Sequence, residues 1–143
     1  MRRKTEAILS ILYRLHIISP KGIFVWAKSL ISEGISLMAL LRFTAHFYPQ
    51  RCAITDEKQS LSYQDLYIRT RQLAEILHTE YHLQPEMSVA LLGRNSLILT
   101  LLLHALSRLC IRTTLLSTDL GTEQITTDLQ KHHYHLIIYD SDI

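Results

Sequence analysis

The chain has 143 residues, 48% hydrophobic and 20% charged, which is enough for one domain with a buried core and excludes disorder as the main state. Its two cysteines, Cys52 and Cys110, lie far apart, which excludes a disulfide framework and favours a reducing, cytoplasmic compartment. Residues 1–51 carry eight Lys or Arg and two Glu (+6), whereas residues 52–143 carry seven Lys or Arg and eleven Asp or Glu (−4), which gives the net charge of +2.

Targeting and membrane-spanning segments are not expected. The basic start turns apolar, but Arg14 and His16 interrupt the apolar run, which excludes a secretory signal. The most apolar window, residues 97–116, contains three basic side chains whose burial costs too much for a bilayer span, namely His104, Arg108 and Arg112.

Residues 1–49 are predicted to form a helical basic leader. Apolar positions recur at helical spacing between Thr5 and Ile18, and Pro20 suits the first turn of a second helix that ends at Glu33-Gly34. Ser36 can cap a third helix that Pro49 stops. The apolar stripe of the second helix consists of Ile23, Phe24, Ala27, Leu30 and Ile31.

The helical leader could contact either of two surfaces. Stripes of this kind usually pack against a core, so we favour docking on the acidic body. The alternative is peripheral contact of residues 1–31 with an anionic membrane surface, where Trp26, Lys21 and Lys28 would suit the headgroup layer.

The body, residues 50–143, begins with a predicted β-hairpin. Residues 53–55 and 60–63 are strand-like and are joined by a polar four-residue loop. Ser62 precedes a helix and lies three residues before Asp65, which predicts a reciprocal cap. The buried face of that helix is expected to contain Tyr63, Leu66, Tyr67, Thr70, Leu73, Ala74 and Leu77.

Three strands and two helices follow in alternation, which predicts an α/β fold with a βαβαβ parallel sheet. The strands are expected at residues 88–92, 111–116 and 136–139. Residues 97–109 are apolar nearly all round and predict a deeply packed helix, and a second helix is expected at residues 122–132.

Nucleotide-binding signals are weak, because only four scattered glycines occur. Gly93-Arg94-Asn95-Ser96, at the first turn from strand to helix, is the one place where an anion could sit. A simple tight turn is the interpretation we favour there.

Metal and nucleophile patterns are also weak, so we predict no metal and no catalytic residue. His78 and His82 are four residues apart but lack the metalloprotease pattern, and His132, His133 and His135 suit a helix end without a metal. Neither cysteine has an activating neighbour, and Cys110 is expected to be a buried small residue. Basic residues are dispersed, which excludes a nucleic-acid partner.

The order of segments resembles the adenylate-forming enzymes, and among them bacterial long-chain fatty acyl-CoA ligases. Leu61-Ser62-Tyr63-Gln64-Asp65-Leu66 fits the family's first box, and residues 48–54 are similar to its lead-in. Residues 89–96 resemble the family's strand ending in Asn-Ser, and residues 105–109 its helix before the second box. The resemblance covers roughly residues 35–140, with Cys110 where the family usually has Gly.

The resemblance implies that a carboxylate reacts with ATP to give an acyl-adenylate and then with coenzyme A, with magnesium needed by the complete enzyme. The helical leader with Pro20 and Gly34 also resembles an extension found in some fatty acyl-CoA ligases. The family's phosphate loop and C-terminal domain have no counterpart in this sequence. We therefore expect an incomplete N-terminal subdomain, from a truncated or divided enzyme, that is inactive alone.

Two other functions stay open. The chain could be a freestanding α/β interaction module whose leader binds a membrane surface or a protein, or a small enzyme that uses the histidine-rich end. For the ligase hypothesis we expect a downstream ligase fragment as partner, or self-association through an apolar sheet face.

Overall fold

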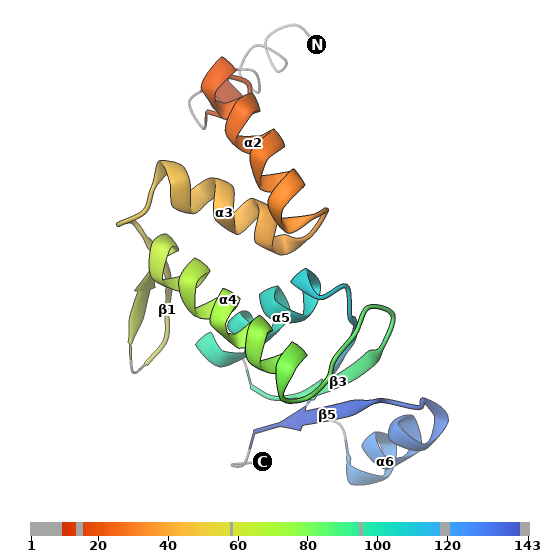
Figure 1. The fold of residues 1–143 in the computed structure, drawn as a ribbon. Helices are drawn as coiled ribbons and strands as arrows, with labels where there is room; N and C mark the ends of the chain where they lie inside the picture. The colour runs from red at the N-terminus through yellow and green to blue at the C-terminus, as the bar shows by residue number, and fades with distance from the viewer. Residues whose placement is uncertain (1–9, 14–15, 58, 95, 118–120, 141–143) are drawn as a thin grey trace, which may run out of the picture.

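The computed structural model describes residues 10–13, 16–57, 59–94, 96–117 and 121–140. The helix predicted between Thr5 and Ile18 lies largely outside these ranges, and of it the structure describes a helical stretch at residues 10–13. The elements that follow are α2 Pro20–Glu33, α3 Leu37–Phe47, β1 Cys52–Thr55, β2 Ser60–Ser62, α4 Tyr63–Thr79, β3 Ser88–Leu92, α5 Leu97–Arg108, β4 Arg112–Leu116, α6 Thr122–Lys131 and β5 Leu136–Tyr139 (Figure 1).

Helix α2 starts and stops on the predicted signals. The Gly22 amide donates to the Ser19 hydroxyl (3.0 Å) beside Pro20 in the first turn, and Gly34 ends the helix with φ 67°.

Ser36 precedes α3 as predicted, but its side chain forms no capping hydrogen bond to the helix. The Ser36 hydroxyl donates to the Glu33 carbonyl (2.8 Å), and the Leu37 amide donates to Ser107 of α5 instead (3.1 Å).

The hairpin and its following helix are confirmed. Strands β1 and β2 pair antiparallel, and the Asp65 amide donates to the Ser62 hydroxyl (3.1 Å) at the start of α4. The Ser62 hydroxyl also donates to the Asp65 carboxylate (2.7 Å), so the reciprocal half of the cap is a hydrogen bond between the two side chains. The buried positions of α4 fall on the predicted face, namely Leu66, Thr70, Ala74 and Leu77.

The predicted parallel sheet is also confirmed. Its order is β4-β3-β5, with Val89 of β3 opposite both Thr113 of β4 and Leu136 of β5. Figure 1 shows α4 and α5 on one face of the sheet and α6 on the other, as two crossover connections require. Strand β3 is the central and most buried strand.

Two apolar clusters hold the body together. One joins β3 to α4 and α5 and contains Ala74, Leu77, Leu83, Val89, Leu91, Leu102, Ala105, Leu106 and Ile111. The other joins α3 and the hairpin to the starts of α4 and α5 and contains Met38, Leu41, Leu61, Leu66 and Leu97. Helix α3 therefore shares its core with the body. Helix α5 is deeply packed, as predicted, with Leu97, Leu102, Ala105 and Leu106 buried, except at Ile98, which is 65% exposed.

Helix α2 presents the opposite face from the predicted one. The stripe of Ile23, Phe24, Ala27, Leu30 and Ile31, called the α2 stripe below, is exposed. The buried positions are Gly22, Val25, Ser29 and Glu33. No helix among the described residues is both long and apolar enough to cross a bilayer.

Candidate functional site

A hollow of about 980 Å³ lies at the carboxyl ends of β3 and β5, beneath the hairpin and beside the start of α5. This position is where ligands bind in open α/β sheets. We call it the strand-end hollow. Its apolar lining consists of Ile54, Leu91, Leu92, Leu97, Ile98, Leu99, Leu102, Leu103 and Ile138, and its polar lining includes Thr55, Asp56, Glu57, Gln59, Arg94, Ser96, Thr100 and Asp140.

The polar residues are placed by backbone geometry at the ends of strands. In the hairpin loop the Asp56 amide donates to the Gln59 carbonyl (2.9 Å), and the Gln59 amide donates to the Asp56 carboxylate (2.9 Å). Across the hollow the Asp140 amide donates to the Leu92 carbonyl and extends the pairing of β5 with β3 (3.0 Å). The loop residues were predicted only as a turn, since their sequence spacing carries no sign of a binding role.

The predicted anion turn forms part of this hollow. Gly93, Arg94 and Ser96 line it, whereas Asn95 lies outside the described residues. The Ser96 hydroxyl accepts from the Leu99 amide (3.1 Å) and so caps α5. Since that bond uses the hydroxyl as an acceptor, the described part of the turn serves first as a helix start.

The histidine pair His78 and His82 does not share a helix face. Helix α4 ends at Thr79, His82 has φ 54°, and the His78 ring Nδ1 is bonded to the Leu83 carbonyl (2.9 Å). One helical turn therefore does not bring the two rings together.

Two of the C-terminal histidines are hydrogen-bonded to the first residue of β3, the central strand. The His135 ring accepts from the Ser88 amide (3.2 Å), and the Ser88 hydroxyl donates to the His133 carbonyl (2.8 Å). His132 lies 3.7 Å from the Asp128 carboxylate, an ion pair when His132 is protonated. Among the described residues no three His, Cys, Asp or Glu side chains are grouped so as to hold a metal ion.

Both cysteines are exposed, so the predicted burial of Cys110 is wrong. Cys110 follows α5 with φ 55°, in the left-handed region. The Cys52 thiol lies 3.3 Å from the Thr55 hydroxyl in the hairpin. Among the described residues neither thiol is hydrogen-bonded to a basic group, the ordinary means of activating such a nucleophile.

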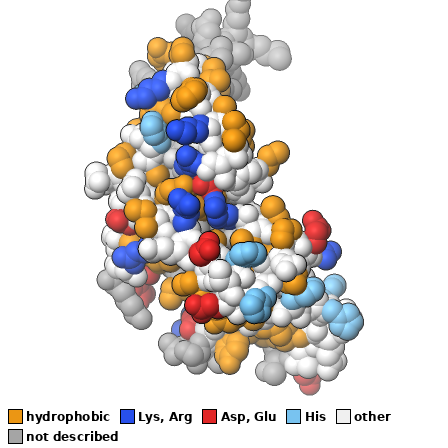
Figure 2. All heavy atoms as spheres, viewed as in Figure 1, with side chains coloured by type: hydrophobic (Ala, Val, Ile, Leu, Met, Phe, Trp, Pro, Cys, Tyr) orange, Lys and Arg blue, Asp and Glu red, His pale blue; other side chains and the backbone are white. Residues whose placement is uncertain are grey.

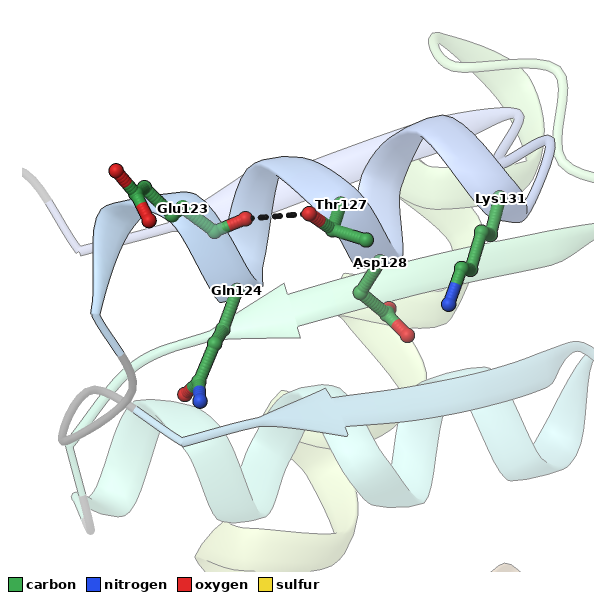
Figure 3. A pocket seen from close by; sticks show the side chains of 5 residues that line it. All are labelled: Glu123, Gln124, Thr127, Asp128 and Lys131. Atoms are coloured by element: carbon green, nitrogen blue, oxygen red, sulfur yellow. Dashed lines mark hydrogen bonds between the residues drawn. The ribbon is translucent and has the colours of Figure 1, made fainter.

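A second, shallower depression of about 320 Å³ follows one side of α6 (Figure 3). Its residues all come from this one helix, and the Thr127 hydroxyl donates to the Glu123 carbonyl (2.7 Å). Figure 3 shows the side chains spread along the helix without converging on one point. It is a surface feature of a helix and not a binding site of the usual concave kind.

The described residues do not fit a magnesium–ATP complex. Such a site needs amides converging on phosphate and carboxylates placed for the metal. The strand-end hollow offers one described helix start, whose capping hydroxyl is already engaged, and no metal-holding cluster. What the hollow does offer is a large apolar wall with a polar rim.

The α/β layers, with a hollow at the carboxyl ends of the strands, are the arrangement in which many α/β domains bind small molecules. Residues 41–142 match the family model described as AMP-binding enzyme, and the chain belongs to that family. No curated protein matched the chain.

Solved structures share the fold. O-succinylbenzoate coenzyme A synthetase (MenE) from Bacillus subtilis, solved in complex with ATP and magnesium ion, is 24% identical with a TM-score of 0.66, over 72% of this chain and 28% of that one. The N-terminal subdomain of NpsA from Klebsiella oxytoca is 18% identical with a TM-score of 0.69, over 76% of this chain and 28% of that one. The chain thus spans little more than a quarter of these solved proteins.

Proposed function

We propose that this chain is the N-terminal scaffold of an AMP-forming fatty acyl-CoA ligase and is inactive without further polypeptide. In the complete reaction a carboxylate oxygen attacks the α-phosphorus of ATP and releases pyrophosphate. The thiol of coenzyme A then attacks the acyl carbon and releases AMP. The need for ATP and coenzyme A supports a cytoplasmic location for the proposed reaction.

The strand-end hollow is the observation that carries the proposal. In a chain of this family, an apolar wall at the ends of the strands supports binding of an aliphatic tail. The proposed substrate class is therefore a long-chain fatty acid. The polar rim, including Thr55, Gln59 and Ser96, offers hydrogen-bonding groups for the polar end of such a substrate.

Inactivity of the chain alone follows from the chemistry. Phosphoryl transfer to a carboxylate depends on placed positive charge and oriented donors around the phosphates. Among the described residues no cluster could hold a metal ion, and the match to MenE covers 28% of the MenE chain. The remaining groups would have to come from additional polypeptide.

The test begins with the purified chain, ATP, magnesium and a long-chain fatty acid, with pyrophosphate release as the readout. We expect no release above the blank. Pyrophosphate formed by the chain alone would overturn the proposal. The DNA after codon 143 is then read in all three frames, where we expect a Ser/Thr/Gly-rich loop followed by Lys, and unrelated sequence would favour the interaction module.

The acyl-binding role is tested in the protein reconstituted with that downstream polypeptide. Ile98 lines the hollow and is mostly exposed, so Ile98→Arg should leave the fold intact. We expect it to raise KM for a long-chain acid more than for acetate, with kcat less affected. Ile68→Arg, on the exposed side of α4, is the matched control, and equal effects of the two variants would contradict an acyl site here.

A further inference from the structure

Helix α2 exposes its apolar side while burying a polar one. Ile31 is 87% exposed and Phe24 69%, whereas Ser29 and Glu33 are buried. Ile35, in the turn after the helix, is 98% exposed and continues the α2 stripe. A contiguous apolar face of this kind among the described residues is typical of a surface that contacts another molecule.

The helix cannot simply roll over to bury the stripe. The Glu33 carboxylate forms ion pairs with Arg42 of α3 (3.6 Å) and Arg108 of α5, and it accepts from the Tyr67 hydroxyl of α4 (2.8 Å). On the same side the ring of Trp26 lies 5.2 Å from that of Phe43. Rotation would break these contacts and leave Arg42 and Arg108 without the carboxylate that pairs with them.

The charges around the α2 stripe indicate what kind of partner it contacts. Lys21 and Lys28 lie on the exposed surface of α2, and its one carboxylate, Glu33, is buried and paired. Figure 2 shows Lys and Arg gathered over the part of the molecule that contains α2 and α3, beside hydrophobic side chains, with most of the Asp, Glu and His over the lower part. An apolar helix face edged by lysines is the arrangement of helices that lie in a membrane interface.

We propose that the outer face of α2, with Ile35, lies on an anionic lipid bilayer. The apolar side chains enter the boundary between headgroups and acyl chains, and the lysines lie at the headgroup level. A second copy of the chain fits less well, because an isologous contact would bring two leaders of charge +6 together. The proposal concerns the leader alone and does not depend on the ligase function.

Vesicle co-sedimentation of the full 143-residue chain tests the apolar part. We expect binding to phosphatidylcholine vesicles that contain phosphatidylglycerol, and much weaker binding to phosphatidylcholine alone. The double variant Phe24→Ser, Ile31→Ser should lose about tenfold in affinity or more, since each side chain contributes apolar burial. The matched control is Ile68→Ser, Ile76→Ser, which removes exposed apolar side chains from α4 and should bind like the parent.

Separate variants test the electrostatic contribution to vesicle binding. Lys21→Gln with Lys28→Gln should lower affinity for the anionic vesicles by roughly fivefold per lysine and weaken the salt dependence, while Lys131→Gln on α6 should not. Binding to neither vesicle, or equal binding by the Phe24 and Ile31 double variant, overturns the proposal. So does a parent that light scattering finds dimeric and that this double variant makes monomeric, because a second copy then covers the stripe.

Discussion

The left-handed backbone conformation of Cys110 was not predicted from the sequence. Helix α5 ends in a Schellman motif, in which the Cys110 amide donates to the Ser107 carbonyl (3.2 Å) and the Ile111 amide to the Leu106 carbonyl (3.0 Å). The motif requires a left-handed residue, and Cys110 has φ 55°. Glycine is favoured here because it has no Cβ, which gives a physical reason for the glycine that the family resemblance led us to expect.

Replacing Cys110 with glycine should therefore stabilise the fold. The substitution removes the left-handed strain of a Cβ, roughly 1–2 kcal/mol, but increases the entropy of the unfolded chain, so we expect a net gain of about 0.5–1 kcal/mol. Urea unfolding should show a higher midpoint at unchanged slope. Cys110→Ala is the control, since it removes the thiol and keeps the Cβ, and an equal gain from alanine would disprove the backbone explanation.

At the scale of elements, periodicity located the helices and strands well. The hairpin, α4 and the three parallel strands lie where alternation, capping residues and apolar runs predicted them, because these are local signals. Periodicity failed at α2, where the apolar positions were expected to be buried. The face that α2 presents to the body carries Glu33, whose partners Arg42 and Arg108 lie on other helices, and no local pattern reveals such a pairing.

The lining of the strand-end hollow was likewise predicted only in part. The turn at Gly93 was predicted from a strand end followed by a helix start, and it does line the hollow. The contribution of the hairpin loop, through Asp56 and Gln59, was not predicted, because it depends on where the hairpin is placed relative to the start of α5. Local structure could be predicted from the sequence, whereas the positions of the elements relative to one another could not.

Glu33 should be the residue that holds α2 on the body. Its carboxylate is almost fully buried, whereas Arg42 and Arg108 are each 27% exposed, so Glu33→Gln leaves partners that water can partly solvate. We expect a loss of about 2–3 kcal/mol, below the range for fully buried pairs. Urea unfolding measures it, with exposed Glu75→Gln as a control that should change stability by less than about 0.5 kcal/mol. A neutral Glu33→Gln would show that packing alone fixes the helix.

At the scale of the whole molecule, the parallel sheet has an unpaired edge at β5 among the described residues. Strand β5 pairs with β3 on one side only, and its side chains alternate between the α4 and α5 cluster and the opposite face. On that opposite face Tyr139 is 68% exposed, and Ile137 is also exposed. Unpaired edges and exposed apolar faces favour association with another chain.

We therefore expect the chain alone to self-associate through β5, in a manner that depends on concentration. Ile137→Lys with Tyr139→Lys should lower the average mass in light scattering, because charges on the open face and edge oppose pairing of two sheets. Ile68→Lys adds a charge on exposed α4 and serves as the control. The double variant Phe24→Ser, Ile31→Ser should leave the mass unchanged, which separates the sheet from the α2 stripe. A parent chain that stays monomeric at high concentration would mean that the open sheet is not adhesive and that further polypeptide is not needed to cover it.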